Sequence, residues 1–166
     1  MFTLTRDDGY TISTDPTRLD LDLVHGWLSL DAYWALGRDR ETVARAFAGS
    51  IGFGVYRPAD GRQVAVARVI TDRATFGYLC DVYVDRAERG RGLGTWLAGA
   101  VRDHLAELGV RRILLATNDA HGVYEKVGFN CVPPDRWMEL DRRDPQPVSP
   151  LTGKDRMADP ALTVEP

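Results

Sequence analysis

An apolar stretch at residues 76–84 leads through a short basic, glycine-rich segment directly into a second stretch that starts at Leu93. The first stretch is typical of a buried strand, and apolar residues at three- and four-residue steps predict that the second is an amphipathic helix. Glycines at positions 90, 92 and 94 permit a sharp turn and a close approach of a ligand to the backbone. The first N–H groups of such a helix are unpaired and lie at the positive end of its dipole. The segment therefore predicts an anion-binding site.

Three arginines, Arg86, Arg89 and Arg91, surround this turn. Guanidinium groups suit a ligand with several phosphates better than one with a single carboxylate, so a diphosphate is the expected ligand. The alternative is an ordinary tight connection with solvated arginines, because short glycine motifs also occur by chance. The mononucleotide loop is a poor fit, since Thr95 and Trp96 follow the last glycine where that loop has Lys and Ser or Thr. The glycine spacing also departs from the dinucleotide fingerprint.

The pattern Arg89-x-x-Gly92-x-Gly94 after an apolar strand resembles the acyl-coenzyme A loop of the GNAT superfamily of N-acetyltransferases, Gln/Arg-x-x-Gly-x-Gly/Ala. A second signature of that family follows in order, a strand that ends in Asn118 and then Val-Tyr-Glu-Lys-Val-Gly-Phe at residues 123–129. The resemblance covers roughly residues 8–140. It implies an α/β fold with a mixed, mostly antiparallel central sheet flanked by about four helices. The sheet would splay between its fourth and fifth strands, here residues 76–84 and 112–117, with acetyl-coenzyme A in the gap.

The order of the elements read from the sequence agrees with that fold. Helices are expected at residues 19–30 and 40–48, the second capped by Asp39, then from residue 93 to a stop at Gly109, and at residues 119–127. Strands are expected at residues 10–13, 51–56, 64–71, 76–84 and 112–117, with closing strands at 129–132 and 136–140 around Pro133 and Pro134.

Composition limits the class of protein. A chain of 166 residues with a hydrophobic content of 44% is typical of one globular domain, which we expect at residues 1–140. Five of the nine prolines follow residue 141, so residues 141–166 are expected to be a tail without a fold of its own. A net charge of -3 argues against a nucleic-acid partner, and no apolar run is long enough for a membrane span. Cys80 and Cys131 are expected to be buried free thiols, which indicates a cytoplasmic protein.

The resemblance also implies roles for individual residues. A backbone N–H at a strand bulge, which corresponds to Val82, would stabilise the oxyanion, and Val84 and its neighbours would hold the pantetheine arm. The residues expected to bind the cofactor are Val82, Tyr83, Val84, Arg89, Gly90, Arg91, Gly92, Leu93, Gly94, Thr95 and Asn118.

Two side chains are candidates for proton transfer. Tyr124 lies where the family has its acid tyrosine, and a phenol is suited to donate a hydrogen bond to a departing thiolate. The alternative is a core tyrosine on an apolar helical face. Asp81, a carboxylate inside an apolar strand, is the candidate base because burial favours proton uptake. It would act directly or through a water. Its alternative is a structural role, either paired with a buried arginine such as Arg68 or capping a loop, and His121 is the rival base.

Aromatic side chains near the first two helices are candidates for the walls of an acceptor pocket, with core packing as the alternative. The pocket residues expected are Trp34, Phe53, Phe76 and His121. The sequence thus predicts a metal-independent N-acetyltransferase that acts on a primary amine of a small molecule or peptide. A catalytically silent acyl-coenzyme A sensor or interaction module is the alternative. A homodimer through an exposed sheet edge is compatible with either function.

Overall fold

Residues 1–141 are described by the structure, a computed structural model of the chain. The chain divides into two compact units after Asn130. The expected domain boundary at residue 140 stays a prediction, and all but the first residue of the expected tail lies outside the described residues. The architecture below is that of the first unit.

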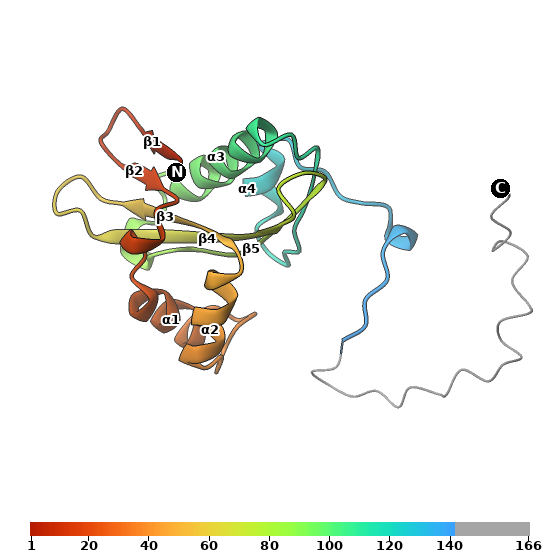
Figure 1. Cartoon of the computed structure of the whole chain (residues 1–166), viewed down its shortest axis with the longest axis horizontal. Coiled ribbons are helices and arrows are strands. Elements are labelled where there is room, and N and C mark those ends of the chain that lie inside the picture. Colours follow the sequence, from red (N-terminus) through yellow and green to blue (C-terminus); the bar gives the residue numbers. More distant parts are fainter. Residues whose placement is uncertain (142–166) are drawn as a thin grey trace, which may run out of the picture. The chain divides into compact units, whose positions relative to one another are not determined.

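A six-stranded sheet forms the centre of this unit, with its strands side by side in the order of the chain (Figure 1). Neighbouring strands pair antiparallel up to β5, and β6 pairs parallel to β5. The strands are β1 (Thr3–Thr5), β2 (Thr11–Ser13), β3 (Ile51–Tyr56), β4 (Gln63–Thr71), β5 (Phe76–Val84) and β6 (Arg112–Leu114). The mixed, mostly antiparallel sheet expected from the sequence is confirmed.

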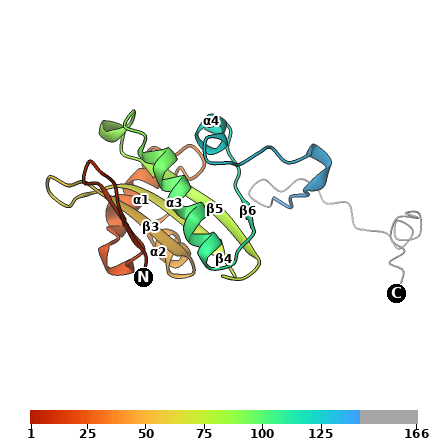
Figure 2. The ribbon, with the colours of Figure 1, turned by 90° about the horizontal axis from the view of Figure 1, so that it is seen from above.

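Four α-helices cover the two faces of the sheet: α1 (Leu21–Leu30), α2 (Arg40–Ala48), α3 (Leu93–Glu107) and α4 (His121–Glu125). The first two lie on one face, and α3 and α4 lie on the other (Figure 1). Figure 2 shows α3 lying across the strands, with β6 beside β5. One core cluster joins the inner side of α3 to β3, β4 and β5, and a second joins α1 and α2 to Val66 and Tyr83.

Local sequence signals account for the helix ends. The carboxylate of Asp39 accepts a hydrogen bond from the backbone N–H of Thr42, so the predicted N-cap of α2 is confirmed. Asp20, for which no cap was predicted, caps α1 in the same way by accepting from the N–H of Leu23. Gly109, just beyond the end of α3, has a φ of 85°, which a glycine adopts without strain.

A bulge interrupts the pairing of β4 with β5. Val66 lies opposite Tyr83, but Arg68 lies opposite Cys80, so Asp81 and Val82 together face a single residue of β4. Asp81 has a φ of 49°, in the left-handed region that non-glycine residues seldom adopt. The extra residue shifts the alternation of β5, so Leu79 and Val82 both pack against the core on the α3 side.

Some expected strands differ in the structure. β1 was not expected, because its three side chains are exposed and carry no hydrophobic pattern. β6 ends at Leu114 instead of residue 117. The predictions of strands at 129–132 and 136–140 are wrong: no strand occurs there, and Pro134–Arg136 forms a 3-10 turn. Two consecutive prolines lack the N–H groups that a strand ladder needs. Over residues 1–141, no helix is both long and apolar enough to cross a bilayer.

Candidate active site

The second half of β5 has an unpaired side. Its pairing with β6 ends at Tyr78 opposite Leu114, so residues 79–84 pair with β4 on one side and with no described strand on the other. We call residues 79–84 the free edge of β5. The sheet is therefore splayed between the two strands that the sequence predicted. Main-chain N–H and C=O groups along such an edge are available to a ligand.

A loop of residues 86–92, called here the phosphate loop, connects the free edge to α3. It begins with a 3-10 turn at Arg86–Glu88 and continues through Gly90 and Gly92, whose φ angles are 79° and 72°. A Cβ atom at either glycine would meet nothing within 4 Å, so the loop is open on the side of these residues. Gly92 is the N-cap of α3, and no side chain accepts a hydrogen bond there. The geometry suits an anion bound by main-chain N–H groups.

The three arginines near the loop have protein partners. Arg86 forms a two-pronged ion pair with Asp31, at the end of α1. Arg89 donates to the carbonyl of Val84 at 3.0 Å and lies over the ring of Tyr83. The side chain of Arg91 pairs with Glu88 at 3.2 Å.

These pairs change the interpretation of the basic loop. Hydrogen bonds from Arg86 and from the Tyr83 hydroxyl lower the pKa of Asp31 to about 2, so this carboxylate is charged at neutral pH. Two carboxylates thus lie among three arginines. The pairs lower the net positive charge around the loop, while all three guanidinium groups stay partly exposed and the main-chain groups at the glycines are open to a ligand.

Asp81, at the bulge, is buried between two guanidinium groups. Its Oδ2 accepts a hydrogen bond from Arg68 at 2.7 Å, and its Oδ1 accepts one from Arg38 at 3.0 Å. Arg68 in turn donates to the hydroxyl of Ser50 at 3.1 Å. The pairing with Arg68 is the structural alternative that the sequence left open for Asp81, and Arg38 is an additional partner. The prediction that Asp81 is the base stays a prediction.

Tyr124, in α4, is partly buried beside the ring of Phe129. Burial raises the pKa of its phenol to about 12, so the hydroxyl keeps its proton at neutral pH. Tyr33, from the loop between α1 and α2, lies near this group: its hydroxyl accepts a hydrogen bond from the N–H of Asn118 at 3.3 Å. Through this bond the segment just before α4 is joined to the loop between α1 and α2.

The expected pocket residues are dispersed. Phe53 is fully buried and packs edge-on against Phe2 and His104, so it belongs to the core. Phe76 lies at the paired end of β5, opposite Arg112 and away from the free edge. Trp34 packs at right angles against Tyr33, and 37% of it is exposed. His121 is the exposed first residue of α4.

Several residues of this region carried no signal in the sequence. Asp31 and Arg38 come from the loop after α1, and their spacing along the chain does not reveal that they reach the phosphate loop and Asp81. Tyr33, in the same loop, was a candidate for the acceptor pocket, but its contact with Asn118 had no signal. Glu88 had a weak signal that sequence reasoning did not use, since it is an acidic residue among the arginines of a glycine-rich loop.

Both cysteines of the described residues carry free thiols. Cys80 is a half-buried free thiol whose pKa is raised to about 11 by burial. Cys131 is exposed, which corrects the expectation of two buried thiols. Across residues 1–141, no three His, Cys, Asp or Glu side chains are grouped as ligands of a metal ion.

Known proteins resemble this chain in both sequence and fold. A family model described as the acetyltransferase (GNAT) family matches residues 21–129. A Gibberella zeae protein named "Putative acetyltransferase FG08082" is 34% identical over 140 residues, which cover 74% of this chain and 78% of that protein.

Two solved structures extend the likeness. A Xanthomonas campestris pv. campestris protein, described as "a putative acetyltransferase belonging to the gnat family", is 46% identical, with a TM-score of 0.74 over 80% of this chain and 92% of its own. A Clostridium acetobutylicum "predicted acetyltransferase with acetyl-CoA" shares the fold, at 19% identity and a TM-score of 0.61, over 80% of this chain and 95% of its own.

Proposed function

Because this chain belongs to the GNAT family of acetyltransferases, which use acetyl-coenzyme A, we propose that it acetylates a primary amine of a small molecule or peptide. The amine attacks the donor directly while both are bound. The single observation that carries this proposal is the juxtaposition of an uncapped helix N-terminus with the free edge of β5. Such an arrangement suits a ligand that has a diphosphate at one end and an extended amide arm at the other.

The residues present fit this donor. The N–H groups at the start of α3, from Gly92 to Thr95, hold the diphosphate, because the loop is open at its left-handed glycines. Main-chain groups of Val82 and Val84 bind the arm in the manner of an added strand. When bound, acetyl-coenzyme A supplies the activated acetyl thioester.

The bulge gives one main-chain N–H a separate role. In our proposal the N–H of Val82 donates to the oxygen on which negative charge develops. The support is local: the left-handed Asp81 turns the backbone just before Val82, and its side chain is held by Arg68 and Arg38. A donor held in this way needs little reorganisation during the reaction.

Tyr124 is the proposed proton donor for the departing thiolate. Its phenol remains protonated at neutral pH, since burial raises its pKa to about 12. For the base, the contacts favour a supporting role for Asp81, because both of its oxygens already accept hydrogen bonds from arginines. A water molecule or His121, which is exposed at the start of α4, is then left to take the proton from the amine.

On the acceptor side, we propose that Tyr33 and Trp34 contact the amine substrate. Both rings are partly exposed, and Tyr33 connects its loop to the segment before Tyr124. Aromatic faces suit apolar or cationic amines.

The experiment that tests the function follows free thiol released from acetyl-coenzyme A across a panel of small amines and peptides with free N-termini. Release that depends on one acceptor supports the enzyme. Binding of coenzyme A without turnover on any acceptor would support the alternative, a silent sensor or interaction module. If calorimetry detects no binding of coenzyme A, both functions are wrong.

The cellular setting stays a proposal. The free thiols of Cys80 and Cys131 favour a reducing compartment such as the cytoplasm.

β1 is an exposed edge strand through which two copies could pair into a homodimer. Size-exclusion chromatography with light scattering tests the dimer.

A further inference from the structure

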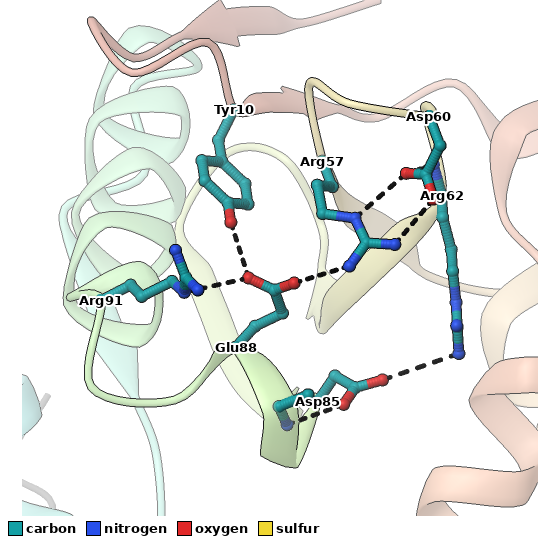
Figure 3. Close-up of polar contacts among 8 residues, drawn as sticks. Tyr10, Arg57, Asp60, Arg62, Asp85, Glu88 and Arg91 are labelled. Atoms are coloured by element: carbon teal, nitrogen blue, oxygen red, sulfur yellow. Dashed lines mark hydrogen bonds and ion pairs between the residues drawn. The ribbon is translucent and has the colours of Figure 1, made fainter.

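Glu88 is a buried acidic residue in the middle of the basic phosphate loop. Only 4% of it is exposed, yet three donors from three different segments surround its carboxylate (Figure 3). The Tyr10 hydroxyl donates to Oε2 at 2.6 Å and Arg57 donates to Oε1 at 3.0 Å. Arg91 pairs with Oε2 at 3.2 Å. We call these four residues the Glu88 cluster.

The charges of the cluster are balanced within the protein. Hydrogen bonds from Tyr10 and Arg57 lower the pKa of Glu88, so its carboxylate is ionised at neutral pH. A buried carboxylate is tolerated only when it is paired and hydrogen-bonded, so these contacts define where the side chain can lie. Arg57 also donates two hydrogen bonds to Asp60, in the turn before β4, and these bonds fix the position of the Arg57 guanidinium group.

A second set of contacts holds the start of the loop. The carboxylate of Asp85 accepts a hydrogen bond from the N–H of Ala87 at 3.0 Å, and its other oxygen lies 3.8 Å from Arg62 (Figure 3). The 3-10 turn at Arg86–Glu88 is therefore anchored at both ends to the hairpin of β3 and β4.

Arg91 lies between the two left-handed glycines and is held at two points. Its side chain pairs with Glu88, and its carbonyl oxygen accepts a hydrogen bond from Arg6 at 3.2 Å. Glycines on both sides would otherwise give this segment many backbone conformations. Fixing Arg91 therefore fixes the peptide groups on both of its sides, including the N–H of Gly92, which is the first of the groups proposed to hold the diphosphate.

We propose that Glu88 is a positioning residue for acyl-donor binding: it pairs with the side chain of Arg91 and so holds the phosphate loop in the conformation that binds a diphosphate. This inference rests on the proposed function. Arg91 contributes through its main chain, and its guanidinium group stays on Glu88.

If charge alone mattered, removal of Glu88 would change the affinity for coenzyme A in the opposite direction. Removing a carboxylate beside an anion site strengthens anion binding if charge alone matters. Removing the residue that orders the loop weakens binding, because the ligand must then order the loop itself. A gain in affinity for coenzyme A therefore indicates the charge effect, and a loss indicates that Glu88 orders the loop.

Three variants make the test. Glu88→Gln removes the charge and replaces one of the two acceptor oxygens with an amide donor, whereas Tyr10→Phe removes one hydrogen bond without any change of charge. Asp103→Asn is the matched control: it removes an exposed carboxylate that pairs with Arg102 on α3 and makes no contact with Glu88 or its partners. Circular-dichroism melts establish the temperature at which each variant is folded, and calorimetry then measures the dissociation constant for coenzyme A.

We expect Glu88→Gln to weaken coenzyme A binding by about 10- to 100-fold, because it affects all three contacts of a buried carboxylate. Tyr10→Phe should weaken it by about threefold, because Glu88 then keeps both arginine partners. Asp103→Asn should change this affinity by less than about twofold. In ¹⁵N-correlated NMR spectra of the unliganded variants, the amides of Gly90, Gly92 and Gly94 should shift or broaden. The amide signals of Gly61 and Gly109 should stay unchanged. General destabilisation of the protein would not confine the changes to the glycines of the phosphate loop and the start of α3.

Each outcome decides the matter. If the wild-type protein binds coenzyme A while Glu88→Gln and Tyr10→Phe bind it equally well or more tightly, the inference is wrong and the proposed function stands. Should Glu88→Gln fail to fold, Tyr10→Phe with unchanged affinity and unchanged glycine amides overturns the inference. If the wild-type protein does not bind coenzyme A, the inference falls together with the proposed function.

Discussion

The phosphate loop and the bulge of β5 lie on either side of Tyr83 and Val84, yet they are built in different ways. The phosphate loop presents main-chain groups from consecutive residues, and its glycines are required by their φ angles. At the bulge, the side chain of Asp81 depends on Arg38 and Arg68, which come from a loop and from β4. A ligand site made of backbone follows from a short sequence motif, whereas one made of side chains requires the whole fold.

The largest effect is expected at the bulge. Asp81→Asn should lower the free energy of unfolding by about 3 kcal/mol, because it leaves two guanidinium groups without their buried counter-charge. Asparagine tolerates the left-handed backbone, so the variant changes the charge and spares the bulge from added strain. Urea denaturation measures the change. Asp22→Asn, which removes the exposed partner of Arg40, is the control and should change stability by less than about 0.5 kcal/mol.

The same variant distinguishes the two roles of Asp81. If its role is to hold the bulge, folded Asp81→Asn retains a pH–rate profile of the wild-type shape. A fall in turnover of about 100-fold per folded molecule, with loss of the acidic limb of the profile, would instead identify Asp81 as the base.

A substitution of Tyr124 tests whether the acetyl-transfer step can be impaired without a change in the binding of acetyl-coenzyme A. Tyr124→Phe should reduce kcat by about 100-fold and leave the KM for acetyl-coenzyme A within about twofold, since the hydroxyl acts on the leaving group alone. Tyr56→Phe is the matched control: its hydroxyl is also buried, has no hydrogen-bond partner among residues 1–141, and has its pKa raised to about 12 by burial. Equal losses of kcat in the two variants would contradict the role of Tyr124.

The raised pKa of Tyr124 also predicts the response to alkali. In the unfolded chain the phenol ionises at its ordinary pKa of 10.0, whereas in the folded protein its pKa is about 12. The stability contributed by this group is complete below pH 10 and is lost as the pH rises toward 12. Alkaline melts should show a smaller loss for Tyr124→Phe than for the wild-type protein.

Gly92 tests the backbone nature of the phosphate loop. Gly92→Ala places a Cβ on a residue with a φ of 72°, which costs about 1–2 kcal/mol of stability or forces the loop into another conformation. We expect coenzyme A binding to weaken by about tenfold, because the N–H groups at the helix start change direction.

Gly109→Ala is the control for Gly92→Ala, since Gly109 has a φ of 85° at the opposite end of α3 and likewise open space around it. It should lower stability by a similar amount and leave calorimetric affinity unchanged. Unchanged affinity in Gly92→Ala would mean that the phosphate loop is not the donor site.

The smallest effect is expected at Asp31, which joins the loop after α1 to the phosphate loop. Asp31→Asn releases Arg86 and Arg89 from a carboxylate, so coenzyme A binding at low salt should tighten by about threefold, less at high salt. A tenfold weakening would show that Asp31, like Glu88, positions the loop.

Asp31 also predicts a response to acid. Its pKa falls from 3.8 to about 2 on folding, so its contribution to stability is present above pH 4 and is lost as the pH falls toward 2. Melting temperatures at pH 6 and pH 3, compared between Asp31→Asn and the wild-type protein, measure it.

Local elements were the part of the fold most fully predicted. α2, β3 and β5 begin and end at the predicted residues, and Asp39 caps its helix as expected. Each has a complete pattern of apolar spacing, caps or turn residues within its own segment. The two closing strands failed because a short apolar run resembles a strand even where Pro133 and Pro134 prevent a ladder.

The site was predicted unevenly, for a physical reason. By itself the sequence determined the phosphate loop, since left-handed φ angles and an uncapped helix start are properties of neighbouring residues. It also identified Asp81 and Tyr124 as unusual polar residues in apolar segments.

Only the tertiary structure decided what surrounds those residues. It brought Arg38 and Arg68 to Asp81, Asp31 to Arg86, and Tyr10 and Arg57 to Glu88. Backbone conformation depends on interactions between adjacent residues, whereas ion pairs depend on which distant segments the packed sheet and helices bring within a few ångströms of each other.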